Sequence, residues 1–507
     1  MFGRRRSPQH DRAARPSRRK RILRIALAAL AVLFVARFFG LRSTDRTAWP
    51  APAPGVRLEP AETGGRIQLI DPAKADAILA ALPPATNAPI HAYRVFQAGG
   101  LDALSPDDRS AIDKRWNCGE EGICVLWDES DWPWGKLFDF LDNTRYAPSI
   151  GFAPNPDGAA RYAAIVNWFP EAVVLFCYDA QSDDSASALR KRSVAARNLV
   201  AGPLFHGAGL LGRTAALECV SLLCRETLMA CADWPVPPLE TAARDAIEQL
   251  RQAESYIVDC AEALREDRVS ILAAVHAIYT GEGGENLAAA AGGETPRGLH
   301  GFGGWVVRRL GGTEEATRAH LDALFSRLIA NAENPYTSDG LVAGLPDWCR
   351  LKKRTPWTRD PVGSAIAAAY LRHAIVAAAV DPTLRLELRA ARVAIALRLW
   401  KDAHGGAYPA TLDELASGEK PLLVPADFAD PFAPDGAPLR YGRDGDGWRF
   451  WSVGLDGRDG GGARDAFTAP PGADTSDADL VFTSHERDIR RAALRPSIWF
   501  WHSNAAH

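Results

Sequence analysis

The chain has 507 residues, of which 47% are hydrophobic and 24% are charged. This composition excludes wholesale disorder, and the length is too great for one ordinary domain. The formal net charge is only −3, but residues 1–21 carry nine Lys and Arg against one Asp. Basic charge on a tail instead of a folded face is not typical of a nucleic-acid-binding protein, so no nucleic-acid partner is expected.

Residues 22–41 form an almost wholly apolar segment directly after the basic tail. As a helix they would reach roughly 30 Å, the thickness of a bilayer core. Arg24 and Arg37 lie near its ends, where their side chains can extend to the headgroups. The sequence therefore predicts a basic cytoplasmic tail at 1–21 and a transmembrane helix at 22–41 that contacts the lipid bilayer. Because cationic flanks stay in the cytoplasm, we expect a single-pass protein of the bacterial inner membrane with its bulk in the periplasm.

A cleavable signal peptide is the alternative for the same apolar segment. Ala51, Pro52 and Ala53 have the small-x-small pattern of a cleavage site, but they lie well beyond the apolar run and Pro54 follows them. That is a poor cleavage site. An uncleaved anchor is favoured, and whether the segment is removed stays open.

Three regions follow the membrane segment. Residues 42–65 are rich in Pro, Ala and Gly, which is typical of a linker. Short apolar runs separated by turn residues predict a small mixed α+β module at 66–180. Long stretches rich in Ala, Leu and Arg predict a helical region at 186–380. The expected fold class is α+β and mostly helical.

Four cysteines are candidates for disulfides in an oxidising compartment. Cys118 and Cys124 flank a turn short enough for their sulfurs to meet. Cys219 and Cys260 lie in a predicted helical hairpin, where antiparallel register about the Pro-rich turn at 235–238 brings them opposite each other. Buried thiols are the alternative for both pairs.

An acidic and aromatic cluster lies at 127–134. Its members are Trp127, Asp128, Glu129, Asp131, Trp132 and Trp134. Paired carboxylates can hydrolyse a glycan and aromatic rings can stack on sugars, so an envelope hydrolase or glycan-binding protein is the alternative function. A surface loop packed by its own rings is the structural alternative. The sequence contains no nucleophile elbow, H-E-x-x-H or Walker loop, which leaves enzymatic activity undecided and favours a non-enzymatic role.

Residues 383–485 carry four motifs in order, and a C-terminal tail follows at 486–507. The motifs are the helix Ala390–Trp400, the Gly-Ala-Tyr-Pro turn with the segment that ends at Leu415, the Asp430-Pro431-Phe432 turn that leads to Tyr441, and the strand and loop Trp451–Gly457. Together they resemble the globular domain of the type II secretion major (G-type) pseudopilins. The resemblance implies a pilin-like fold, in which a long helix packs on a small antiparallel sheet.

The residues themselves predict the same elements. A helix of about twenty residues is expected from Thr383, and β-like segments are expected at 439–441 and 448–453. One apolar stripe recurs at helical spacing for the sheet to cover, and it consists of Leu388, Ala391, Ile395 and Leu399.

The resemblance also implies a calcium site in the loop after the strand. The residues that match it best are Leu455, through its carbonyl, and the carboxylates of Asp456, Asp459, Asp477 and Asp479. Calcium prefers such oxygen ligands, and clustered carboxylates repel one another unless a cation is present. Asp465 and Asp474 are competing ligands, and a solvated Asp/Gly turn without metal is the alternative.

Two departures limit what the resemblance implies. No Gly-Phe-Thr-Leu-x-Glu processing site precedes Ile22, and a long region separates the membrane segment from the pilin-like helix. The chain is therefore not expected to be processed or to polymerise as a pilus subunit. We expect a membrane-anchored, extracytoplasmic structural or interaction protein, linked to secretion or envelope assembly through envelope proteins that the sequence does not identify.

Overall fold

The structure is a computed structural model of the whole chain, and it describes the part from 68 to 485 with gaps. The described residues are 68–70, 150–152, 173, 176–177, 184–201, 205, 209–233, 240–257, 260–280, 313–332, 360, 362–364, 366–367, 370–371, 374, 379–433, 435–454, 456–462 and 479–485. The predicted basic tail, transmembrane helix, linker and C-terminal tail lie outside them. None of the described helices is long and apolar enough to span a bilayer.

The prediction of a mostly helical α+β fold is confirmed for the described residues. Within the predicted mixed module, two short strands, β1 (Gln68–Ile70) and β2 (Ile150–Phe152), pair in parallel. The helices of the predicted helical region are α7 (Ser185–Ala201), α8 (Gly209–Asp233), α9 (Glu240–Ser255), α10 (Cys260–Thr280) and α13 (Glu314–Ala332). The long helix expected from Thr383 is α16 (Val380–Ala403).

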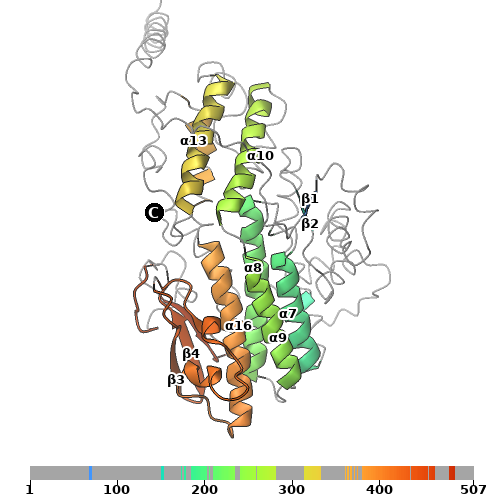
Figure 1. Cartoon of the computed structure of the whole chain (residues 1–507), viewed down its shortest axis with the longest axis vertical. Helices are drawn as coiled ribbons and strands as arrows, with labels where there is room; N and C mark the ends of the chain where they lie inside the picture. The colour runs from blue at the N-terminus through green and yellow to red at the C-terminus, as the bar shows by residue number, and fades with distance from the viewer. Residues whose placement is uncertain are drawn as a thin grey trace, which may run out of the picture.

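These helices form two groups along the long axis of the molecule. Helices α7, α8 and α9 lie beside α16 in a lower layer, and α10 pairs with α13 above it, as Figure 1 shows. The lower end of α10 also packs on α8, which joins the two groups.

Local sequence explains how individual helices begin and which face they bury. The carboxylate of Asp184 accepts hydrogen bonds from the amides of Ala186 (2.9 Å) and Ser187 (3.0 Å), which caps the start of α7. Helix α9 is amphipathic, with acidic Glu240 in its first turn and one apolar face. The buried residues of that face are Ala243, Ala246, Ile247, Leu250 and Ala253.

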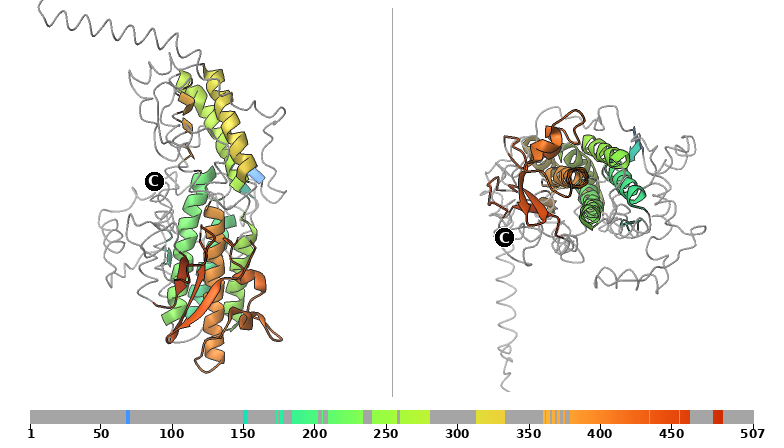
Figure 2. Two further views of the ribbon diagram at one scale, coloured as in Figure 1. Left: turned by 90° about the vertical axis from the view of Figure 1, so that its left-hand side faces the viewer. Right: turned by 90° about the horizontal axis from the view of Figure 1, so that it is seen from below.

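Helix α16 is buried on nearly all sides, which the single predicted stripe did not anticipate. It packs on α8 and α9 and also contacts two 3-10 turns, η4 (Leu412–Ala416) and η5 (Pro425–Phe428). Seen from below, α16 lies between the sheet and the other lower helices (Figure 2). The four stripe residues are buried as expected, but so are Leu386, Val393 and Leu397, which are not part of the stripe. Helix α16 is thus covered by α8 and α9 on one side and by the C-terminal turns and sheet on the other, and it lies at the centre of this part of the fold.

The C-terminal sheet has three antiparallel strands in the order β3-β4-β5. They are β3 (Arg440–Asp444), β4 (Gly447–Ser452) and β5 (Leu480–Thr483), and the first two confirm the predicted β-like segments. The tight turn between them uses Gly445 at φ +58, a conformation that favours glycine.

One face of the sheet is apolar and buried. In β4 the buried residues Trp448, Phe450 and Ser452 alternate with partly exposed Arg449 and Trp451, as the period of a strand requires. The rings of Trp448 and Phe450 stack at 5.0 Å between centroids, and Phe482 of β5 stacks on Phe450 at 5.3 Å. This aromatic row belongs to the same buried core as α16.

Candidate functional site

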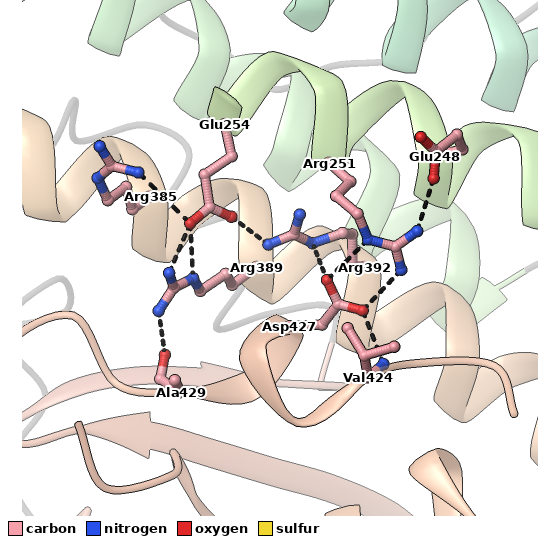
Figure 3. A network of polar contacts seen from close by, with 9 residues as sticks. All are labelled: Glu248, Arg251, Glu254, Arg385, Arg389, Arg392, Val424, Asp427 and Ala429. Carbon is pink, nitrogen blue, oxygen red and sulfur yellow. Dashed lines mark hydrogen bonds and ion pairs between the residues drawn. The ribbon is translucent and has the colours of Figure 1, made fainter. Parts of the chain in front are cut away.

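A network of arginines and carboxylates joins α9, α16 and η5 (Figure 3). Its centre is Glu254, near the end of α9, which three arginines of α16 approach. Arg389 donates from Nη2 to Glu254 Oε1 at 2.5 Å, Arg392 donates to Oε2, and Nη1 of Arg385 lies 3.7 Å from Oε1. The three arginines are four and three positions apart, so they share one face of the helix.

The second carboxylate of the network is Asp427 in η5. It accepts a hydrogen bond from Arg251 of α9 at 2.8 Å and lies 3.5 Å from Nε of Arg392. It also accepts the amide of Val424 at 2.9 Å, which closes the turn. Arg389 donates to the carbonyl of Ala429 at 2.7 Å. The arginine network therefore fastens the segment before the sheet to both helices.

The central charged side chains of this arginine network are buried, so each of them needs a partner of opposite charge. The side chain of Arg392 is 1% exposed, that of Asp427 is 3% and that of Glu254 is 13%. Burial by itself would raise the pKa of Glu254, but Arg392 and Arg389 outweigh it and hold that pKa below its ordinary value. The pKa of Asp427 is lowered in the same way, with Arg251 and Arg392 outweighing burial. Carboxylates that are ionised and occupied by arginine donors are poor acids and poor metal ligands, so this array acts as a clamp.

A further buried pair joins α16 to α8. Arg225 of α8 donates to Glu387 of α16 at 2.8 Å, and the two side chains are 4% and 0% exposed. Burial raises the pKa of Glu387, although Arg225 acts in the opposite direction. Charged groups thus connect α16 to each of its helical neighbours.

A cluster of acids lies where α8 begins against α10. The amide of Gly209 donates to Glu266 at 3.0 Å, and the amide of Leu210 donates to Asp267 at 3.1 Å. Gly209 has φ +59, and a Cβ there would lie 1.8 Å from Asp267 Oδ1, so only glycine fits. Arg213 of α8 lies close by and pairs with Asp381 of α16 at 3.1 Å. We call Glu262, Glu266, Asp267, Asp381 and Arg213 the acidic joint.

An Asp–His pair joins α13 to Asp360, which lies outside that helix. Nδ1 of His320 lies 3.0 Å from Oδ2 of Asp360, an arrangement that can orient an imidazole for proton transfer. The other oxygen of Asp360 accepts from Thr317 at 2.8 Å and from the amide of Gly363 at 2.9 Å. The buried carboxylate therefore serves as a helix cap that ties α13 to the segment from 360 to 364, which is a structural role.

Three of the five predicted calcium ligands lie in the described loop. Asp459 accepts hydrogen bonds from Trp451 Nε1 (3.0 Å) and from Arg440 Nε (3.1 Å). Asp479 is fully buried and accepts the amides of Gly460 (3.1 Å) and Gly462 (2.7 Å). Asp456 accepts the amide of Arg458 at 3.0 Å. Leu455 and Asp477 lie outside the described residues, as do the competing Asp465 and Asp474.

The carboxylates of this loop show some of the features expected of a cation-binding site. Burial raises the pKa of Asp479, and the charges of Asp459 and Asp456 raise it further while the two amides oppose them. The three carboxylates are thus near enough to repel one another, which a bound cation would relieve. Asp459, however, is held by Arg440 and Trp451, as a group outside the inner ligand shell would be. Within the described ranges no three or more His, Cys, Asp or Glu side chains are grouped closely enough to hold a metal ion.

The predicted disulfide between Cys219 and Cys260 does not form in the structure, where both side chains are buried thiols. The register of the predicted hairpin was wrong because α9 ends at Ser255 and Cys260 begins a further helix, α10. Cys260 lies near Arg213, whereas Cys219 lies near Cys177. Cys118 and Cys124 lie outside the described residues, as does the acidic and aromatic cluster at 127–134.

Comparison of the chain with protein-family models, with curated proteins and with solved structures finds no match in any of the three. The likeness of the C-terminal residues to pseudopilins therefore stays a resemblance carried by the motifs.

Sequence reasoning missed the arginine network, although one half of it is visible in the sequence. Arg385, Arg389 and Arg392 recur at helical spacing on a helix rich in Leu, Ala, Val and Ile. Such a row needs acidic partners if the helix is buried. The acidic partner Glu254 lies more than a hundred positions earlier in the chain, and no local pattern connects the two.

Replacing Glu254 with Gln should destabilise the chain by about 3–5 kcal/mol, because buried Arg392 would lose the closer of its two charged partners and Arg389 would lose its carboxylate. Urea unfolding of the full-length chain, followed by circular dichroism, measures the change in the free energy of unfolding. The matched control is Glu240→Gln on the same helix, where an exposed pair with Arg244 should contribute no more than about 0.5–1 kcal/mol. Equal losses of unfolding free energy in the two variants would show that the arginine network does not hold α9, α16 and η5 together.

Proposed function

We propose that the chain is a membrane-anchored, extracytoplasmic structural or interaction protein of a bacterial envelope. In this proposal the helices α7, α8 and α9 are a scaffold that presents the pseudopilin-like C-terminal unit to an envelope protein partner. The observation that carries it is the position of α16, which packs on α8 and α9 and also contacts η4 and η5. A unit clamped in this way keeps a fixed orientation, as a docking module requires.

The orientation in the membrane rests on the sequence of residues 1–41. Reporter domains fused after Ser43 test it, since an enzyme that is active only in the periplasm and a fluorescent protein that matures only in the cytoplasm give opposite signals. We expect periplasmic activity and no cytoplasmic fluorescence from the fusions. The reverse pattern would invert the orientation and remove the proposal of an extracytoplasmic role.

The second part of the proposal is that the loop from 454 to 479 binds calcium. Asp479 and Asp456 are the residues whose position and charge support an inner-shell role, with Leu455 and Asp477 as further ligands from the resemblance. Bound calcium would neutralise the loop and fix it against β4, because Asp459 already bonds Trp451 of that strand. Extracellular modules bind calcium at about 10⁻⁴–10⁻³ M, which suits a compartment where calcium is abundant.

Isothermal titration of the full-length, chelator-treated chain with calcium tests this loop. We expect uptake at about 10⁻⁴–10⁻³ M that is abolished by Asp456→Ala and by Asp479→Asn. The matched control is Asp446→Ala in the exposed β3–β4 turn, which should leave the titration unchanged. Heat evolution that persists in both loop variants would show that the ligands were wrongly assigned.

A further inference from the structure

Arg192 of α7 differs from the other buried arginines of the described helices. It is 3% exposed, and its Nε and Nη1 atoms are buried without a hydrogen-bond partner. No carboxylate in the described ranges forms an ion pair with it. The buried arginines that do have an acidic partner are Arg213 with Asp381, Arg225 with Glu387, Arg268 with Asp322 and Arg392 with Glu254. A buried charge without a counterion is costly, so a negative charge is needed beside Arg192.

Arg192 lies near the end of α8, where a second arginine arrives from α16. Arg398 of α16 donates to the carbonyl of Cys231 at 3.3 Å and is 12% exposed. Burial raises the pKa of the Cys231 thiol to about 12, and the positive charges of Arg192 and Arg398 oppose this rise. The acid that pairs with Arg398 is Asp402 of its own helix, at 3.0 Å. Two guanidinium groups from different helices therefore lie near the same buried thiol.

The chemistry of Arg192 selects the kind of group that can complete this site. A water molecule could accept its N–H groups, but water carries no charge to offset that of the guanidinium. The planar guanidinium fork matches two oxygens of a phosphate, sulfate or carboxylate group. Because Arg192 is almost fully buried, the site has room only for a small ion. A tetrahedral inorganic oxyanion satisfies both conditions.

We propose that Arg192 is the centre of a buried anion site between α7, the end of α8 and α16, and that this site binds a small inorganic oxyanion of the phosphate type. Arg398 contributes a second positive charge from α16. The bound ion stabilises the fold, because it supplies the counterion that Arg192 does not find among the described residues. It also links α7 to α16, which the arginine network does not do.

Isothermal titration of the full-length, chelator-treated chain with sodium phosphate tests the site. A constant background of sodium chloride ensures that only selective binding of the oxyanion registers. We expect uptake that Arg192→Met abolishes and that Arg192→Lys weakens by about tenfold or more, because lysine keeps the charge but loses the fork. The matched control is Arg190→Gln, an exposed position of the same helix, which should leave uptake unchanged. Absence of uptake, or uptake that persists in Arg192→Met, would overturn the proposal.

Urea unfolding at the same chloride concentration gives an independent readout. The unfolding equilibrium constant of the unchanged chain should fall by about tenfold for each tenfold rise in phosphate above the dissociation constant. Without phosphate, Arg192→Met should unfold at higher urea than the unchanged chain, because an apolar side chain replaces an uncompensated charge, and phosphate should not affect this variant. A lower urea midpoint for Arg192→Met without phosphate would show that a group of the chain pairs with Arg192. If Arg192→Met does not fold, an unchanged chain whose stability ignores phosphate would still contradict the proposal.

Discussion

The structure depends on the burial of one charged helix, α16, between the helices α8 and α9 on one side and the C-terminal turns and sheet on the other. Removing an unpaired ion from water costs several kcal/mol, and α16 carries Arg392 and Glu387 at 1% and 0% side-chain exposure. Their partners come from three other elements, namely α9, α8 and η5. Each element therefore needs the others, because the loss of any one would leave a charge buried without its counterpart. This mutual dependence makes the sheet and the lower helices one structural unit.

Such an arrangement changes what the pilin-like motifs mean for this chain. In a free-standing pilin-like unit the helix would need cover from its sheet alone. Here its remaining surface packs on α8 and α9, and Arg398 of its last turns donates to the carbonyl of Cys231 at the end of α8. The likeness to pseudopilins therefore describes local motifs, whereas the architecture around α16 belongs to this chain. Helix α16 contacts the acidic joint at one end, through Asp381, and the turns beside the sheet towards the other end.

Local signals in the sequence predicted the local elements. Apolar periodicity placed the helices, and the β-like segments at 439–441 and 448–453 became β3 and β4, because these features depend only on neighbours in the chain. The partner of Arg392 and the crowding of Glu266 with Asp267 around α8 could not be predicted, since they depend on segments that meet only in the folded chain. The same limit explains why Cys219 and Cys260, which the sequence made disulfide candidates, are free thiols in the structure. Of the candidate calcium site, the sequence predicted the acidic loop but not that Arg440 and Trp451 hold Asp459.

Hydrogen exchange of the full-length chain across a urea titration at neutral pH tests the central dependence most directly. If α16 holds the helices α8 and α9 and the C-terminal sheet in one unit, peptides from α9, α16 and β4 should lose protection together, at one urea concentration. Loss of protection in β4 at clearly lower urea, while α9 and α16 stay protected, would show that the sheet is an independent unit and would contradict the account.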